Sequence, residues 1–138
     1  MKFIRFLKKY PIVIIRNFTI KELECPCCKK SGVVLDLVIN LQAFRNLLSM
    51  KYHRDIRIHV NSAYRCPKHN HDVGGVPNSQ HVLGKAVDIW SPDLPTHILY
   101  NDAIDSNLFS TIIYYKKSNF IHIDIRNRQA KKYWEWDK

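Results

Sequence analysis

The sequence predicts an α+β domain in which helices pack on one mostly antiparallel sheet. Helical and strand-like segments are mixed along the chain, and a tight turn joins the last two predicted strands, at residues 108–115 and 120–125, into a hairpin. A length of 138 residues with 46% hydrophobic residues corresponds to one ordinary domain with its own core. We expect a basic N-terminal arm at residues 1–16 and one domain at residues 17–138.

The N-terminal arm contains basic and apolar residues but lacks the pattern of a targeting segment. Its longest apolar run, residues 12–15, is too short for the core of a signal peptide or for a membrane-spanning helix, and Pro11 interrupts any helix there. We expect an extended arm packed on the domain; the alternative is a basic amphipathic stretch on a membrane surface. The sequence predicts neither a signal peptide nor a membrane contact, and hence a protein made in the cytoplasm.

Capping and periodicity predict the elements of the first half. Thr19 can cap a helical turn over residues 17–23, with Glu22 three residues later completing a capping box. Residues 35–50 form a helix with one apolar stripe, made by Leu37, Leu41, Phe44, Leu47 and Leu48. The alternating, β-branched segment 56–60 is predicted to be a strand.

The second half begins with a predicted polar loop over residues 61–84, which contains a glycine pair and a proline. A strand over residues 85–90 and a helix over residues 95–106 follow, and the hairpin comes after them. The C-terminal tail carries Trp134 and Trp136 among other aromatic residues, and we expect it to dock on the domain; the alternative is a lip that grips glycan or peptide.

Polar side chains on two predicted strands lie opposite apolar faces. Because side chains alternate along a strand, Val87 and Ile89 share a core face and Asp88 points to the other side. In the last predicted strand three isoleucines form the apolar face, so His122 and Asp124 point away from it. Each of the two strands therefore presents a metal-binding side chain from an otherwise apolar context.

A third such residue, His81, precedes the first of these strands. Gly84 permits a turn between them, so that His81 can approach Asp88. Two imidazoles and one carboxylate, from His81, His122 and Asp88, match the three-ligand form of a catalytic zinc site with an open position. Taken singly, His122 is explained equally well as a hydrogen-bonded structural histidine and Asp88 as a turn-stabilising carboxylate; one shared metal explains all three together.

These residues stand in a recognisable pattern. The segment Ser79-x-His81-x-x-Gly84-x-Ala86-x-Asp88, followed by an aromatic residue, Ile, His122-x-Asp124, resembles the zinc D-alanyl-D-alanine carboxypeptidase and endopeptidase family. That family includes VanX dipeptidases, phage L-alanyl-D-glutamate endopeptidases and, as a relative, the hedgehog signalling domain. The lead-in Asn61-Ser-Ala-Tyr-Arg65, with Asn70 and Gly74-Gly75, is also similar, and the resemblance extends over residues 18–126. It implies a hedgehog- and DD-peptidase-like fold, Zn²⁺ as cofactor and zinc ligands at His81, Asp88 and His122.

Amide hydrolysis at such a site also needs a cation for the developing oxyanion. Arg65 stands at the place of the family's arginine, and the resemblance implies that it contacts this oxygen; the alternative is a surface ion pair. We expect Tyr64 and Ser79, which belong to the same motifs, to contact the substrate.

The general base is the main departure from the family. Asn119 and Phe120 stand where relatives carry a glutamate or a histidine. Asp124 is the best substitute, because it lies on the same strand face as His122, and orienting His122 is its equally weighted alternative role. If Asp124 is structural, another carboxylate or His69 must serve.

The cysteines leave three interpretations open. Cys25-Pro-Cys27-Cys28 and Cys66-Pro-Lys-His69 combine Cys-x-x-Cys with Cys-x-x-His, so Cys25, Cys28, Cys66 and His69 can form a second metal site. The N-terminal cysteines can instead form a disulfide with Cys66, or all the thiols can be reduced. A metal or a disulfide would tie the N-terminal segment to the active-site loop, which is a structural role.

The resemblance implies a zinc metallopeptidase that hydrolyses amide bonds in the peptide stems or crosslinks of bacterial peptidoglycan, as a phage endolysin or a wall-remodelling enzyme. The net charge of +10 suits an acidic wall as well as a merely solvated basic face. No recognition element for nucleic acid is present, so we expect no specific nucleic-acid partner. We expect a monomer that reaches the cell wall by another release route. The alternative is a zinc-stabilised module that binds wall or protein without catalysis, which the missing glutamate favours.

Overall fold

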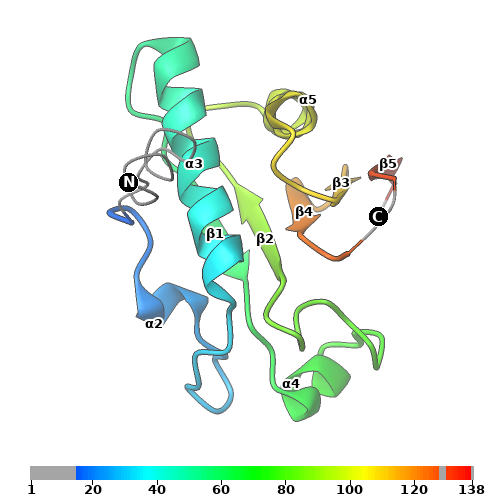
Figure 1. Ribbon diagram of the computed structural model, residues 1–138. Coiled ribbons are helices and arrows are strands. Elements are labelled where there is room, and N and C mark those ends of the chain that lie inside the picture. Colours follow the sequence, from blue (N-terminus) through cyan, green and yellow to red (C-terminus); the bar gives the residue numbers. More distant parts are fainter. Residues whose placement is uncertain (1–14, 128–129, 138) are drawn as a thin grey trace, which may run out of the picture.

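The computed structural model describes residues 15–127 and 130–137, so all but the last two residues of the expected N-terminal arm lie outside it (Figure 1). The helices are α2 (Ile20–Leu23), α3 (Leu35–Tyr52), α4 (Pro67–Asp72) and α5 (Thr96–Ser106). The strands are β1 (His59–Ser62), β2 (Ala86–Trp90), β3 (Thr111–Tyr115), β4 (Phe120–Asp124) and β5 (Lys132–Trp136). They form one sheet in the order β1-β2-β4-β3-β5, in which only the β3–β5 pair is parallel. The predicted α+β class with a mostly antiparallel sheet is confirmed.

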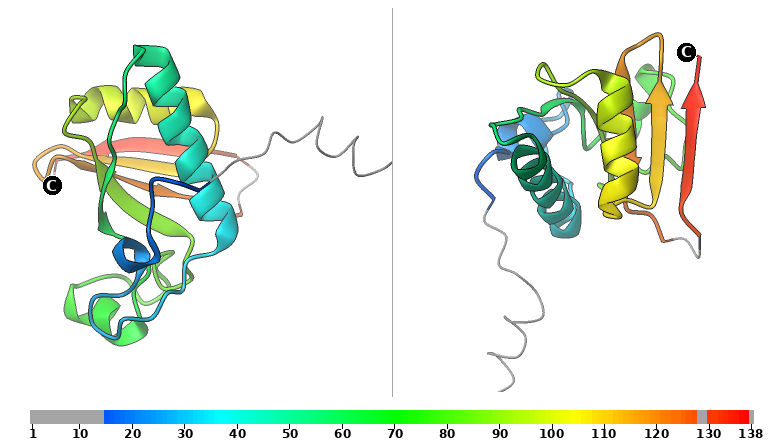
Figure 2. Two further views of the ribbon diagram at one scale, coloured as in Figure 1. Left: turned by 90° about the vertical axis from the view of Figure 1, so that its left-hand side faces the viewer. Right: turned by 90° about the horizontal axis from the view of Figure 1, so that it is seen from above.

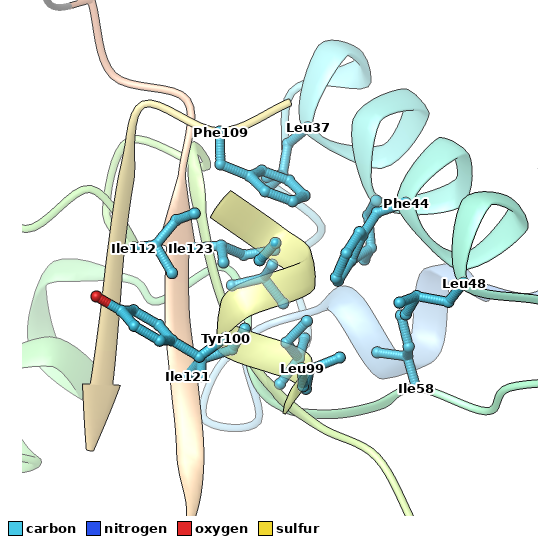
Figure 3. Packing of buried hydrophobic residues seen from close by; sticks show 14 of the residues in the cluster. Leu37, Phe44, Leu48, Ile58, Leu99, Tyr100, Phe109, Ile112, Ile121 and Ile123 are labelled. Carbon is cyan, nitrogen blue, oxygen red and sulfur yellow. The ribbon is translucent and has the colours of Figure 1, made fainter. Parts of the chain in front are cut away.

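The core lies between the sheet and the helices α3 and α5, which cover the same face of it (Figure 2). Side chains from α3, α5, β3 and β4 point toward one another there (Figure 3). Phe44 of α3 meets Phe109 edge to face, with ring centroids 5.5 Å apart, and Ile121 and Ile123 of β4 are fully buried beside them. Burial of this apolar surface is the main term that stabilises the fold, and it fixes which face of each strand is left for polar side chains.

The predicted stripe of α3 is confirmed in its main part. Leu37, Leu41, Phe44 and Leu48 are buried, whereas Leu47 remains 46% exposed because it lies at the edge of the stripe. The cap of α2 is also as predicted: the backbone N–H of Glu22 donates to Thr19 Oγ1 at 3.3 Å. The second bond differs from a capping box, since the Thr19 hydroxyl itself donates to the Glu22 carboxylate at 3.4 Å.

The prediction of a strand over residues 56–60 was wrong at its start. Ile56 and Ile58 are buried as an alternating strand requires, but the ladder begins only at His59. The backbone N–H of Ile56 donates to Ser49 Oγ at 3.0 Å and that of Arg57 to Asp93 Oδ2 at 2.8 Å. These side-chain oxygens accept the backbone N–H groups that would otherwise pair with a neighbouring strand.

Two elements were not predicted. Helix α4 interrupts the expected loop at residues 61–84. Pro67 at its first position is an ordinary start signal, whereas its N-cap, Cys66, whose Sγ accepts the N–H of His69, is not one of the usual capping residues. The aromatic tail docks on the domain as expected, but it does so as strand β5, parallel to β3. Among the described residues, no helix is both long and apolar enough to cross a lipid bilayer.

Candidate metal centre

The register of two strands brings Asp88 and His122 together. Strand β2 pairs antiparallel with β4, and Asp88 stands directly opposite His122. Their neighbours Val87 and Ile123 belong to the core, so Asp88 and His122 point to the sheet face away from α3 and α5. The ring atom His122 Nδ1 lies 3.0 Å from Asp88 Oδ1. The alternation predicted from the sequence is therefore present in both strands.

A turn before β2 brings in His81. Its backbone N–H donates to Ser79 Oγ at 3.2 Å, and the chain then turns at Gly84, whose φ is +72°. A Cβ at Gly84 would collide with the carbonyl oxygen of Gly32, so only glycine fits this place. The Nδ1–H of His81 donates to the Ala63 carbonyl at 2.7 Å, and the other ring nitrogen, Nε2, lies 3.2 Å from Asp88 Oδ1.

Together these three side chains form a buried cluster that can hold a metal ion. One ligand atom from each of His81, Asp88 and His122 lies within 4.8 Å of the others. The three residues are 3%, 6% and 8% exposed, so little water competes for their ligand atoms. Two imidazole nitrogens and one carboxylate oxygen are a donor set that suits zinc and other divalent first-row metals.

Electrostatics at the cluster favour a positive charge. Burial lowers the pKa of His122, but its bonds to Asp124 and Asp88 outweigh burial and raise that pKa to about 9. Burial raises the pKa of Asp88, yet the bonds to His122 and His81 hold it well below its usual range. The two carboxylates thus keep a proton on His122 when no metal is bound, and a bound cation would replace that proton.

Asp124 lies behind His122 and faces away from the cluster. It is fully buried, and its Oδ2 accepts the Nε2–H of His122 at 2.8 Å. The same oxygen accepts bonds from Arg126, from Nε at 3.0 Å and from Nη2 at 2.5 Å. Burial raises the pKa of Asp124, but His122 and Arg126 lower it to about 2. Because Asp124 binds the ring nitrogen remote from Asp88, its geometry favours an orienting role over that of a general base.

Arg65 reaches the cluster from the segment after β1. Its Nη2 donates to Asp88 Oδ2 at 3.4 Å, and its Nε donates to Ser62 Oγ at 3.0 Å. The Asn70 side chain accepts a further bond from Arg65 Nη1 at 3.4 Å. The guanidinium is therefore fixed from three sides beside a carboxylate of the cluster, which is not the arrangement of a surface ion pair.

The cluster lies in a pocket of about 670 Å³. Arg65, Ser79, His81, Asp88 and His122 all line it, whereas Tyr64 and His69 do not. The ring of Tyr64 instead packs against Gly32. Of the described residues that line the pocket, Asp88 is the sole carboxylate.

Sequence reasoning missed most of one wall of this pocket and gave Trp136 a place at the substrate only as the alternative use of the tail. Tyr115, Phe120 and Trp136 line it, together with Arg126. Tyr115 stacks on Phe120 and on Trp136, with ring centroids 4.7 Å and 5.6 Å apart. Arg126 could have been found, because it follows Asp124 by two residues and so continues the same face. The aromatic wall depends on the pairing of β5 with β3, for which the tail gives no local signal.

The cysteines form a separate cluster. The sulfur atoms of Cys25, Cys28 and Cys66 lie within 4.8 Å of one another, and these cysteines are not in disulfides. The fourth residue predicted for this site, His69, does not bring a ring nitrogen into the group, although its backbone N–H donates to Cys66 Sγ at 3.4 Å. Burial raises the pKa of the Cys25 thiol, but backbone N–H donors at Cys66, Cys28 and Cys27 lower it to about 7.

Comparison with known proteins identifies the family. The family model described as Peptidase M15 matches residues 16–124, a stretch that contains His81, Asp88 and His122. No curated protein matches the chain. The match spans most of the 138 residues and agrees with the motifs that resemble the zinc D-alanyl-D-alanine carboxypeptidases. The chain belongs to the Peptidase M15 family, and thus to a family of hydrolases.

Proposed function

We propose that this protein is a zinc metallopeptidase that hydrolyses amide bonds in the peptide stems or crosslinks of bacterial peptidoglycan. The observation that carries the proposal is the convergence of His81, Asp88 and His122 at one buried point of a pocket, in a chain of the Peptidase M15 family. The protein would act as a monomer, as an endolysin or a wall-remodelling enzyme, after release by a route that the sequence does not specify.

The three residues of the cluster would hold the ion through the atoms that face one another. When bound, zinc polarises a carbonyl and lowers the pKa of water, so that a nucleophile exists at neutral pH. Asp124 would prepare His122 for this role: by accepting the Nε2–H, it leaves Nδ1 as the nitrogen with a free lone pair on the Asp88 side.

Arg65 would stabilise the negative oxygen that develops when the amide carbonyl is attacked. Its guanidinium already lies beside Asp88 and is held by Ser62 and Asn70, so it needs no rearrangement when charge appears. A preorganised cation in a partly buried pocket is worth more than one in water, because the local dielectric is lower.

The pocket suits a peptide that bears carboxylates. Arg65 and Arg126 supply positive charge, and the wall of Tyr115, Phe120 and Trp136 supplies apolar surface. Stem peptides combine free carboxylates with small apolar side chains, and their polymer is acidic. The net charge of +10 would concentrate the protein on such a polymer.

A second function is favoured by one observation: the described lining of the pocket offers no carboxylate besides Asp88 to act as a general base. Asp124 faces away from the cluster and His69 does not line the pocket, so neither substitute is in position. The same fold with the same ion would then be a module that binds wall or protein without cutting it.

One experiment separates the two functions. The purified protein with added zinc is incubated with peptidoglycan, and new amino groups are counted while binding is followed by sedimentation. A peptidase releases amino groups, and both a chelator and His81→Ala abolish the release; mass spectrometry of the products then identifies the bond. Sedimentation with the wall and no release of amino groups, at any zinc concentration, would establish the binding module instead.

A further inference from the structure

The sulfur atoms of Cys25, Cys28 and Cys66 lie close enough together to share a metal ion. They lie within 4.8 Å of one another. A tetrahedral zinc with bonds of about 2.3 Å to sulfur sets its sulfur ligands about 3.8 Å apart, whereas a disulfide needs about 2.05 Å. All three thiols are free. One disulfide joins only two sulfur atoms, so it leaves the third sulfur of the cluster unexplained. A single cation can bind all three.

The backbone around these sulfurs holds them in place. The N–H of Lys29 donates to the Cys25 carbonyl at 2.8 Å, the N–H of Cys25 donates to the Lys30 carbonyl at 2.9 Å, and Lys29 takes a left-handed φ of 61°. This tight turn brings Cys25 and Cys28 to the same side. Two sulfurs also accept backbone hydrogen bonds, Cys25 Sγ from the N–H of Cys66 and Cys66 Sγ from that of His69, both at 3.4 Å. Such donors stabilise the negative charge of a thiolate.

We propose that Cys25, Cys28, Cys66 and His69 bind a second, structural zinc ion. His69 follows Cys66 by three residues; its ring is outside the group of ligand atoms within 4.8 Å, so it would complete the site as fourth ligand by a change of side-chain rotamer. The pairs then follow the Cys-x-x-Cys and Cys-x-x-His spacing of closed structural zinc sites. This site shares no ligand with His81, Asp88 and His122, and it goes beyond the proposed function.

The second ion would clamp the N-terminal segment to the strand that leads to Arg65. The backbone N–H of Tyr64 already donates to the Leu23 carbonyl at 3.3 Å, so the two segments run side by side there. Cys66 directly follows Arg65, and Arg65 reaches Asp88. The ion thus fixes the backbone from which Arg65 extends into the pocket, which makes these cysteines positioning residues.

Cobalt tests this site without reference to catalysis. The full-length protein is purified under reducing conditions, stripped of metal and loaded with Co²⁺. A thiolate bound to cobalt gives an intense sulfur-to-metal charge-transfer absorption in the near ultraviolet, and the His81–Asp88–His122 cluster contains no sulfur. We expect this absorption in the wild type and in His81→Ala, and its loss in Cys28→Ser.

Cys27→Ser is the matched control, because Cys27 and Cys28 are adjacent and both exposed. We expect Cys27→Ser to keep the absorption and two zinc ions per chain, and Cys28→Ser to keep one. His69→Ala should keep the absorption but bind cobalt at least 10-fold more weakly.

The proposal is overturned if the wild type shows no charge-transfer band, if thiol titration after chelation reveals a disulfide, or if Cys27→Ser loses the band as Cys28→Ser does. His69 is excluded as the fourth ligand if His69→Ala binds cobalt as tightly as the wild type. Failure of peptidoglycan hydrolysis would leave the charge-transfer band, the thiol titration and the cobalt affinity of this site unchanged.

Discussion

Across the β2–β4 pair, His122 Nδ1 lies 3.0 Å from Asp88 Oδ1. This contact exists because two strands with apolar faces toward the same core are paired in the one register that sets these residues opposite each other. A slip of either strand by one residue would turn that strand's member of the pair toward the core. The register of the sheet therefore positions two members of the cluster, and a turn in front of β2 adds His81.

Replacement of Asp124 by asparagine tests whether this residue orients His122. The amide oxygen can still accept the Nε2–H, but the charge is lost, so we expect metal affinity to fall about 10- to 100-fold. Metal titration together with kcat and KM at saturating zinc measures this. A large loss of kcat with unchanged metal affinity would instead assign Asp124 as the general base.

Removal of the guanidinium in Arg65→Ala tests the oxyanion role. We expect kcat to fall about 100- to 1000-fold, as when another preorganised donor is lost, while one zinc remains at the cluster. Steady-state kinetics and metal analysis on the same preparation give both values. An unchanged kcat would show that Arg65 has no oxyanion role and is only a structural partner of Asp88.

A pair of glycine variants tests whether the tight turn at Gly84 positions His81. Gly84 and Gly74 have φ values of +72° and +76°, so alanine carries the same left-handed penalty at both, about 1–2 kcal/mol. Only at Gly84 does the added Cβ meet the Gly32 carbonyl; at Gly74 nothing is near. We expect Gly84→Ala to lower the unfolding free energy further than Gly74→Ala and to weaken metal binding, as measured by urea unfolding and zinc titration. Equal effects in the two variants would show that the close approach is unimportant.

The pairing of Arg57 with Asp93 predicts a pH-dependent contribution to stability. Side-chain and backbone hydrogen bonds from Arg57 hold the pKa of Asp93 well below its usual range. A carboxyl whose folded-state pKa is depressed stabilises the fold above its unfolded pKa of about 3.9, and that contribution disappears as the pH falls through the folded-state value. We expect Asp93→Asn to be less stable than the wild type at neutral pH, with the gap narrowing below about pH 4. Urea unfolding of both proteins across this range checks it; a constant gap would contradict the assignment.

The sequence predicted the parts that depend on local alternation. Val87 and Ile89 could be assigned to the core without knowledge of the sheet, and that assignment directed Asp88 outward. The same argument holds for His122, and Gly84 predicted the turn that brings His81 near. Local pattern sufficed there because strand geometry itself fixes which way a side chain points.

What depends on pairing between distant segments could not be predicted. The tail with Trp136 forms a pocket wall only because β5 adds to β3, beside Tyr115. Alternation placed Asp124 on the face of His122, but it could not tell which ring nitrogen Asp124 would bind. The rotation of the His122 ring between the two carboxylates determines which nitrogen Asp124 binds. That in turn determines whether Asp124 is placed as a general base or as a residue that orients His122.

Anomalous diffraction at the zinc edge, from crystals of the zinc-loaded protein, tests the central claim most directly. The account predicts a peak about 2.0–2.2 Å from each of three atoms, His81 Nε2, His122 Nδ1 and one oxygen of Asp88. A map with no peak between these residues, or with the three side chains turned away from a common centre, would contradict it.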